Sequence, residues 1–88
     1  MEKTRKDIID IIINTVASLG VFIDYDEEHD FDMSIYFEDS FAFINIIVSL
    51  EDALGIIFPE DLLMIDSYSS FDRVVSIIYE NMLYEHHK

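Results

Sequence analysis

One largely apolar stretch without a helix-breaking residue constrains the fold of this chain more than any other feature. It begins after Asp39, contains neither Gly nor Pro before Gly55, and is followed by Pro59. Asp39 and Ser40 are residue types that favour a helix N-cap, and Gly often follows a helix C-terminus. The stretch therefore predicts an α-helix with Ser40 at its N-terminus and Gly55 just beyond its C-terminus.

The predicted helix carries two apolar faces. At about 100° per residue, one set of side chains has the spacing of a core-facing stripe. These residues are Phe43, Ile46, Ile47, Leu50 and Leu54. A second set is centred about 140° away, and one small core cannot take up both sets. We predict that the second set contacts a partner; it consists of Phe41, Ile44 and Val48.

Helical spacing predicts two further long helices. Thr4 and Asp7 resemble a capping box at the start of residues 4–19, where apolar residues recur every three to four positions until Gly20 ends the run. The same period recurs over residues 70–85. Ser69 and Asp72 resemble a capping box at the start of this last helix.

The remaining segments complete an all-α fold. Pro59 favours the first position of a short third helix, and residues 62–65 are expected to cover one end of the bundle. Residues 21–38 lack a sustained period and predict a long loop pinned by aromatic and aliphatic side chains, namely Phe22, Phe31, Ile35 and Tyr36. We therefore predict three longer helices and one short helix in a single domain, residues 1–88.

The long loop has alternating carboxylates like those of a calcium-binding EF-hand. They belong to Asp24, Asp26, Glu28, Asp30 and Asp32. The turn position that requires Gly is His29, and the closing position that requires Glu is Ile35. We therefore predict a solvated acidic loop and no metal site.

Charge restricts the classes of partner. The formal net charge is −14, and every charged residue from Asp7 to Asp72 is acidic. Nucleic acids and anionic lipids are bound by clustered Lys and Arg, so we expect neither as a partner and expect partners with basic surfaces instead. The N-terminal isoleucines are interrupted by polar residues, which predicts neither a signal peptide nor a membrane-inserted span. We expect a cytoplasmic monomer.

Enzymatic chemistry has few candidate residues. The chain has no Cys, and its histidines are His29 in the acidic loop and the pair His86 and His87 near the C-terminus. Ser40 lacks the GxSxG context of a serine nucleophile, and its alternative role is that of a plain N-cap. We expect no enzyme and no catalytic residue.

A registered set of short motifs accompanies Ser40. Asp39-Ser40-Phe41 is followed by Leu50-Glu51-Asp52, then by Gly55-Ile56 and Pro59. At these positions the chain resembles the acyl carrier protein family and its peptidyl and D-alanyl relatives. Their signature is an Asp-Ser-Leu tripeptide that opens the second helix of a four-helix bundle. Here Phe41 replaces the usual Leu, and Phe37 replaces the Gly that commonly lies three residues before the serine.

The resemblance implies a function for Ser40. In the family, a phosphopantetheinyl transferase attaches phosphopantetheine from coenzyme A to this serine, and the arm carries acyl groups as thioesters. The resemblance also implies a four-helix bundle of acyl carrier type and a role for Asp39 in transferase recognition. It suggests that Glu51 and Asp52, with the second apolar set, meet partner enzymes that load and process the acyl group.

Two questions stay open at the level of sequence. The cargo could be a fatty acyl, polyketide, aminoacyl or D-alanyl group, which leaves fatty acid, polyketide and nonribosomal peptide biosynthesis as possible pathways. The alternative function is a non-enzymatic acidic helical interaction module, or a degenerate carrier that no longer receives the arm.

Overall fold

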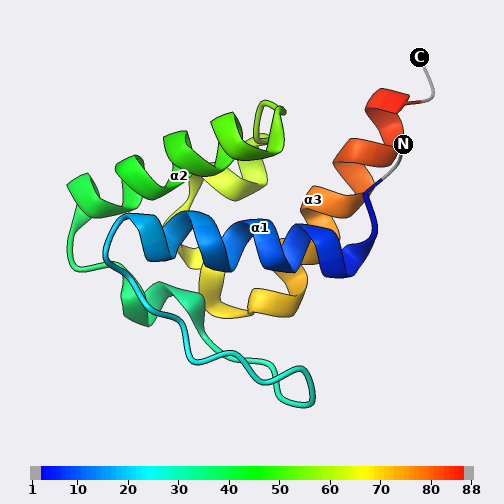
Figure 1. The fold of residues 1–88 in the computed structure, drawn as a ribbon. Helices are drawn as coiled ribbons and strands as arrows, with labels where there is room; N and C mark the ends of the chain where they lie inside the picture. The colour runs from blue at the N-terminus through cyan, green and yellow to red at the C-terminus, as the bar shows by residue number, and fades with distance from the viewer. Residues whose placement is uncertain (1–2, 87–88) are drawn as a thin grey trace.

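The computed structural model describes residues 3–86, with the side chains of residues 3–83. This part of the chain contains three α-helices and no strand: α1 (Arg5–Ser18), α2 (Ser40–Leu54) and α3 (Phe71–His86) (Figure 1). The predicted all-helical fold is confirmed. None of its helices is both long and apolar enough to cross a membrane.

Three short 3-10 helices connect the α-helices. They are η1 (Met33–Tyr36), η2 (Glu60–Leu63) and η3 (Ile65–Ser69). The single short helix predicted from Pro59 is replaced by η2 and η3, because Met64 between them has an extended backbone with φ −114° and ψ 131°. An extended residue cannot continue the helical hydrogen-bond pattern.

Local side chains set the ends of α1 and α2. The Thr4 hydroxyl accepts a hydrogen bond from the Asp7 N–H at 3.1 Å, and the Asp7 carboxylate accepts one from the Thr4 N–H at 2.9 Å. This reciprocal pair is the predicted capping box. Gly55 ends α2 with φ 69°, a left-handed conformation that Gly adopts without the steric cost of a side chain.

The hydrophobic core lies between the three α-helices and extends to the 3-10 segments. Figure 1 shows α1 running alongside α2 and across the start of α3. Ile46, Ile47, Leu50 and Leu54 of α2 are buried as predicted, and Phe43 is half-buried against the same core. The period of the sequence thus identified the core-facing side of α2 correctly.

The prediction for residues 62–65 is only partly right. Leu62 is buried, whereas Leu63, Met64 and Ile65 are exposed. In a 3-10 helix only every third side chain lies on one face, so two short 3-10 helices cannot bury four consecutive residues. Tyr68 of η3 is fully buried and contributes the core ring that the sequence did not predict.

The segment that joins α1 to η1, residues 21–32, is called the strap below. Its carboxylates were predicted to be solvated, and Asp30 is exposed as predicted but also makes hydrogen bonds to the start of α3 that the sequence did not predict. The Asp30 carboxylate accepts hydrogen bonds from the Ser70 hydroxyl and from the Asp72 N–H, the latter at 2.8 Å. Ser70, rather than the predicted Ser69, caps α3, because its hydroxyl also accepts from the Arg73 N–H.

The apolar contacts of the long loop also differ from the prediction. Phe22 and Ile35 are 78% and 71% exposed, so neither pins the loop. Met33 and Phe37 are buried instead and hold η1 against the core. Phe31 does pack as predicted, because its ring stacks on that of Phe71 with the centroids 4.7 Å apart.

Candidate functional site

Ser40 is the first residue of α2, and Asp39 is the N-cap. Asp39 has an extended backbone, and its carboxylate accepts a hydrogen bond from the Ala42 N–H at 2.8 Å. Its carbonyl oxygen accepts one from the Phe43 N–H at 3.0 Å. Capping of α2 therefore does not require the Ser40 hydroxyl, and Ser40 is exposed.

The electrostatic setting of Ser40 has two opposing parts. The first turn of a helix presents unpaired N–H groups and the positive end of the helix dipole, both of which stabilise an anion. Against this, the exposed carboxylates of Glu38 and Asp39 precede the serine, and Asp39 already occupies the Ala42 N–H. An anion attached to Ser40 would therefore compete with Asp39 for the start of the helix.

Three aromatic rings pack together in the core next to α2. Phe37 and Phe43 have their ring centroids 5.1 Å apart, and Tyr68 lies 5.4 Å and 5.3 Å from them. Offset and edge-to-face rings at these separations stabilise a core beyond their buried area. Phe37, which stands where the family commonly has Gly, is thus directed into the core and leaves Ser40 uncovered.

The hydroxyl of Tyr68 is the polar group of this cluster. It donates a hydrogen bond to the Leu62 carbonyl oxygen at 2.6 Å. Burial, with a smaller contribution from the Glu51 charge, raises the pKa of Tyr68 above its ordinary value. The phenol therefore stays protonated and keeps donating, which ties η3 to η2.

An exposed apolar face runs along α2 from the turn that contains Ser40. Phe41, Ile44 and Val48 are 73%, 57% and 58% exposed. Their exposure agrees with the sequence-based assignment, while the contact with a partner stays a prediction. A shallow groove of about 230 Å³ borders this face; it is lined by Phe43, Ile44, Ile47, Val48, Glu51 and Leu63.

The two acidic residues predicted to meet partners occupy different environments. Asp52 is exposed. Glu51 is half-buried, and its carboxylate accepts a hydrogen bond from the Phe58 N–H at 2.7 Å. Glu51 therefore also holds the connection that follows α2, a structural role that the sequence did not reveal.

The predicted site residues all lie on α2 or at its N-cap. Asp39, Ser40 and Phe41 form its start, Ile44 and Val48 follow on the exposed face, and Glu51 and Asp52 lie in its last turn. Leu63 of η2 joins the groove and was missed. Its apolar run, residues 62–65, had no period that could separate an exposed Leu63 from a buried Leu62.

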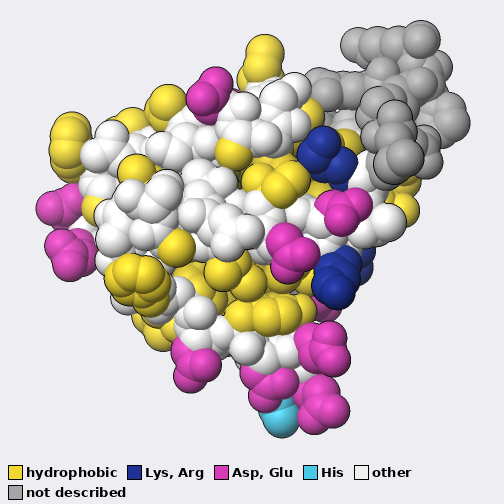
Figure 2. Space-filling view, in the orientation of Figure 1, with side chains coloured by type: hydrophobic (Ala, Val, Ile, Leu, Met, Phe, Trp, Pro, Cys, Tyr) yellow, Lys and Arg dark blue, Asp and Glu magenta, His cyan; other side chains and the backbone are white. Residues whose placement is uncertain are grey.

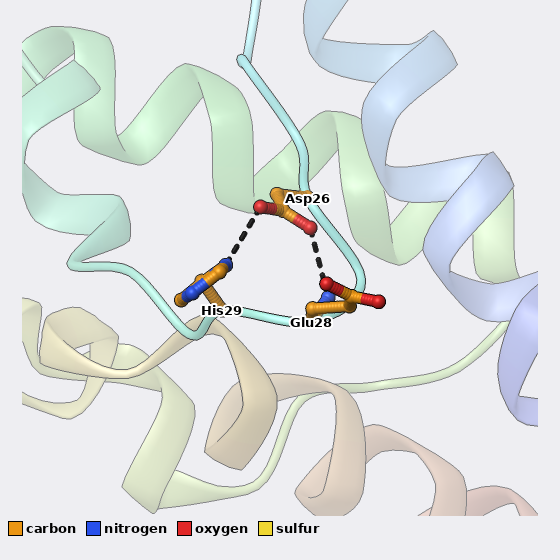
Figure 3. A group of neighbouring side chains, drawn as sticks. All are labelled: Asp26, Glu28 and His29. Carbon is orange, nitrogen blue, oxygen red and sulfur yellow. Dashed lines mark hydrogen bonds and ion pairs between the residues drawn. The ribbon is translucent and has the colours of Figure 1, made fainter.

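A second group of chemically active side chains lies at the tip of the strap. Asp26, Glu28 and His29 are all exposed, and each has a ligand-type atom within 4.8 Å of the others (Figure 3). The Asp26 carboxylate accepts from the Glu28 N–H at 2.9 Å and lies 2.7 Å from the His29 Nδ1 atom. These hydrogen bonds, that from the Glu28 N–H first, lower the pKa of Asp26. They account for the turn without a bound ion.

The strap carboxylate at Asp30 is held differently. Desolvation beside α3 alone would raise the pKa of Asp30, but the opposing hydrogen bonds to its carboxylate are stronger in sum. They come from the Ser70 hydroxyl and from backbone N–H groups, including that of Asp72. The net result is a lowered pKa, so Asp30 stays ionised where it caps α3.

Comparison with known proteins gives no relative from which a role could be transferred. No family model matches the chain, and neither a curated protein nor a solved structure matches it.

Proposed function

We propose that this chain is an acyl carrier protein that holds acyl groups as thioesters on a phosphopantetheine arm attached to Ser40. The observation that supports this most directly is the position of Ser40. It is exposed at the first position of α2, it is not needed as the cap, and it lies at the head of the apolar face formed by Phe41, Ile44 and Val48. In this proposal the fold is a four-helix bundle of acyl carrier type, with η2 and η3 in the place of the short third helix.

The chemistry of the arm suits the composition of the chain. In the transferase reaction the Ser40 oxygen would bond to the phosphorus of the phosphopantetheine group as the pyrophosphate P–O bond of coenzyme A breaks, which releases adenosine 3′,5′-bisphosphate and the hydroxyl proton. The resulting phosphodiester would lie beside the N–H groups of the first turn. The thiol at the end of the arm supplies the nucleophile that this Cys-free chain lacks. The chain itself catalyses no step, and Asp39 serves in transferase recognition.

Electrostatics supports partners with basic surfaces. A net charge of −14 attracts Lys-rich and Arg-rich surfaces and speeds association with them. Figure 2 shows Asp and Glu side chains around much of one face, interspersed with apolar side chains. A cytoplasmic monomer that passes between acyl-loading and acyl-processing enzymes uses both kinds of surface: the apolar face of α2 for contact and the acids for encounter.

The first prediction tests the attachment of the arm. Incubation with coenzyme A and a broad-specificity phosphopantetheinyl transferase should add the mass of one phosphopantetheine group, measured by intact-mass spectrometry. Ser40→Ala should abolish the addition. Ser69→Ala, which removes another exposed serine, should leave the addition unchanged.

An alternative function is supported by one local feature. Phe41 stands where the family has Leu, so the start of α2 differs from the usual transferase target. A chain that stays unmodified with several active transferases would instead be an acidic interaction module or a degenerate carrier. Its contact surface would be the same exposed face of α2.

A further inference from the structure

The strap is joined to the start of α3 by hydrogen bonds that span a long stretch of sequence. The Asp30 carboxylate accepts from the Ser70 hydroxyl and from the Asp72 N–H at 2.8 Å. The Phe31 carbonyl oxygen accepts from the Phe71 N–H at 2.9 Å. The N–H groups of Phe71 and Asp72 belong to the first turn of α3, where no carbonyl of the same helix is available to them. The strap thus supplies the acceptors that this helix end requires.

Apolar packing holds the strap at its ends, where Val21 and Ile23 lie partly buried against the core on one side and Phe31 on the other. The Phe31 ring stacks on Phe71, and the Tyr25 ring lies 5.7 Å from Phe71. Between these two contacts every residue of the strap is exposed. A hollow of about 280 Å³ separates this tip from the helices, and it is bordered on the helix side by Ile9, Phe71 and Asp72. The tip therefore stands away from the bundle.

The segment that follows the strap is anchored independently. Met33 and Phe37, at the two ends of η1, are buried in the core. Movement of the strap can therefore stop at η1 without disturbing α2. At its other end the strap is anchored by Val21 and Ile23, which pack against the core, and by the Asp24 N–H, which donates to the Tyr36 hydroxyl at 3.2 Å.

We infer that residues 25–31 of the strap form a releasable element held on α3 by Asp30, and that they open as a unit while the three α-helices stay folded. The device has two states. In the closed state Asp30 caps α3, and Phe31 with Tyr25 covers the Phe71 ring. In the open state the cap is lost and the Phe71 ring is uncovered. Segments with few buried apolar contacts have low local opening free energies in a protein. This inference does not depend on modification of Ser40.

Native-state amide hydrogen exchange, measured by NMR on the full chain, tests the inference. The diagnostic group is the Phe71 N–H, because its acceptor on Phe31 is not changed by substitution at Asp30. In Asp30→Ala the Phe71 N–H should exchange about tenfold faster or more, as loss of hydrogen bonds to a charged group implies. The N–H groups of Ile12 and Leu50, in the buried core, should change by less than about twofold.

A graded variant and a matched control complete the test. Asp30→Asn keeps an oxygen that can accept from the Asp72 N–H, so it should accelerate exchange at the Phe71 N–H less than Asp30→Ala does. If Asp30→Ala does not fold, the exchange measured in Asp30→Asn tests the inference in its place. Asp24→Ala removes another strap carboxylate and should leave Phe71 exchange unchanged.

Faster exchange at Asp72 alone would reduce Asp30 to a local cap. Equal acceleration at Phe71, Ile12 and Leu50 would show that the strap opens only with the whole bundle. Either result overturns the inference.

Discussion

Asp39 and Ser40 are adjacent residues with similar capping ability and different roles in the structure. The carboxylate of Asp39 accepts the Ala42 N–H, whereas Ser40 is the exposed first residue of the helix. Both residue types favour an N-cap, so composition alone leaves the choice between them open. The extended backbone of Asp39 identifies Asp39 as the N-cap of α2.

This assignment predicts opposite outcomes for two neighbouring substitutions. Asp39→Ala should lower the free energy of unfolding by about 1 kcal/mol, because it removes the cap of α2. Ser40→Ala should change it by less than about 0.5 kcal/mol, because no capping bond is lost. Urea denaturation monitored by circular dichroism measures both values. A larger loss for Ser40→Ala than for Asp39→Ala would return the capping role to Ser40.

At the scale of elements, the sequence predicted the long helices well. Hydrophobic period, a capping box and two glycines placed α1, α2 and α3 to within one or two residues of their observed ends. These signals are local, because each depends on residues within a turn or two of the chain. The core side chains of α2 followed from the same period.

The sequence failed where contacts between distant residues determine structure. The closed strap depends on Asp30 and Ser70, which lie 40 positions apart, and no local pattern relates them. The split of the short helix into η2 and η3 places Tyr68 in the core, where its hydroxyl reaches the Leu62 carbonyl. The proposed attachment role of Ser40 rests on motif resemblance and on its exposed position at the start of α2.

The two apolar faces of α2 should respond differently to truncation. Leu50 is fully buried, so Leu50→Ala should cost about 2–5 kcal/mol through lost burial and a residual cavity. Val48 is 58% exposed, so Val48→Ala should change stability by less than about 0.5 kcal/mol. Thermal melts of the two variants give the comparison. Similar losses at both positions would contradict the division of the helix into a core face and a contact face.

At the scale of the whole molecule, the acidic residues oppose folding. A net charge of −14 on 88 residues brings like charges closer in the compact state than in the unfolded chain. Described ion pairs offset little of this repulsion: Arg5 pairs with Asp72, and His29 lies against Asp26. Repulsion among the remaining carboxylates therefore lowers the free energy of unfolding.

Stability should accordingly rise with salt. The Debye length falls from about 30 Å at 0.01 M to about 10 Å at 0.1 M ionic strength, so sodium chloride over this range should raise Tm. Asp52→Asn should also raise Tm at low salt, because it removes an exposed charge from the last turn of α2, where the helix dipole disfavours an anion. Scanning calorimetry at several salt concentrations checks both effects. A Tm that is indifferent to salt would mean that the carboxylates are mostly paired or capping, as Asp30 is.

The contacts that join the two ends of the chain bear on how the protein is made. Arg5, in the first turn of α1, bonds to Asp72 and Ser76 of α3, and the strap is closed by Ser70. During synthesis the N-terminal helix leaves the ribosome long before these partners exist. Until the last helix has emerged, α1 has only α2 to cover its apolar side, and the strap has nothing to close on. Completion of the native structure is thus deferred until α3 has been synthesised.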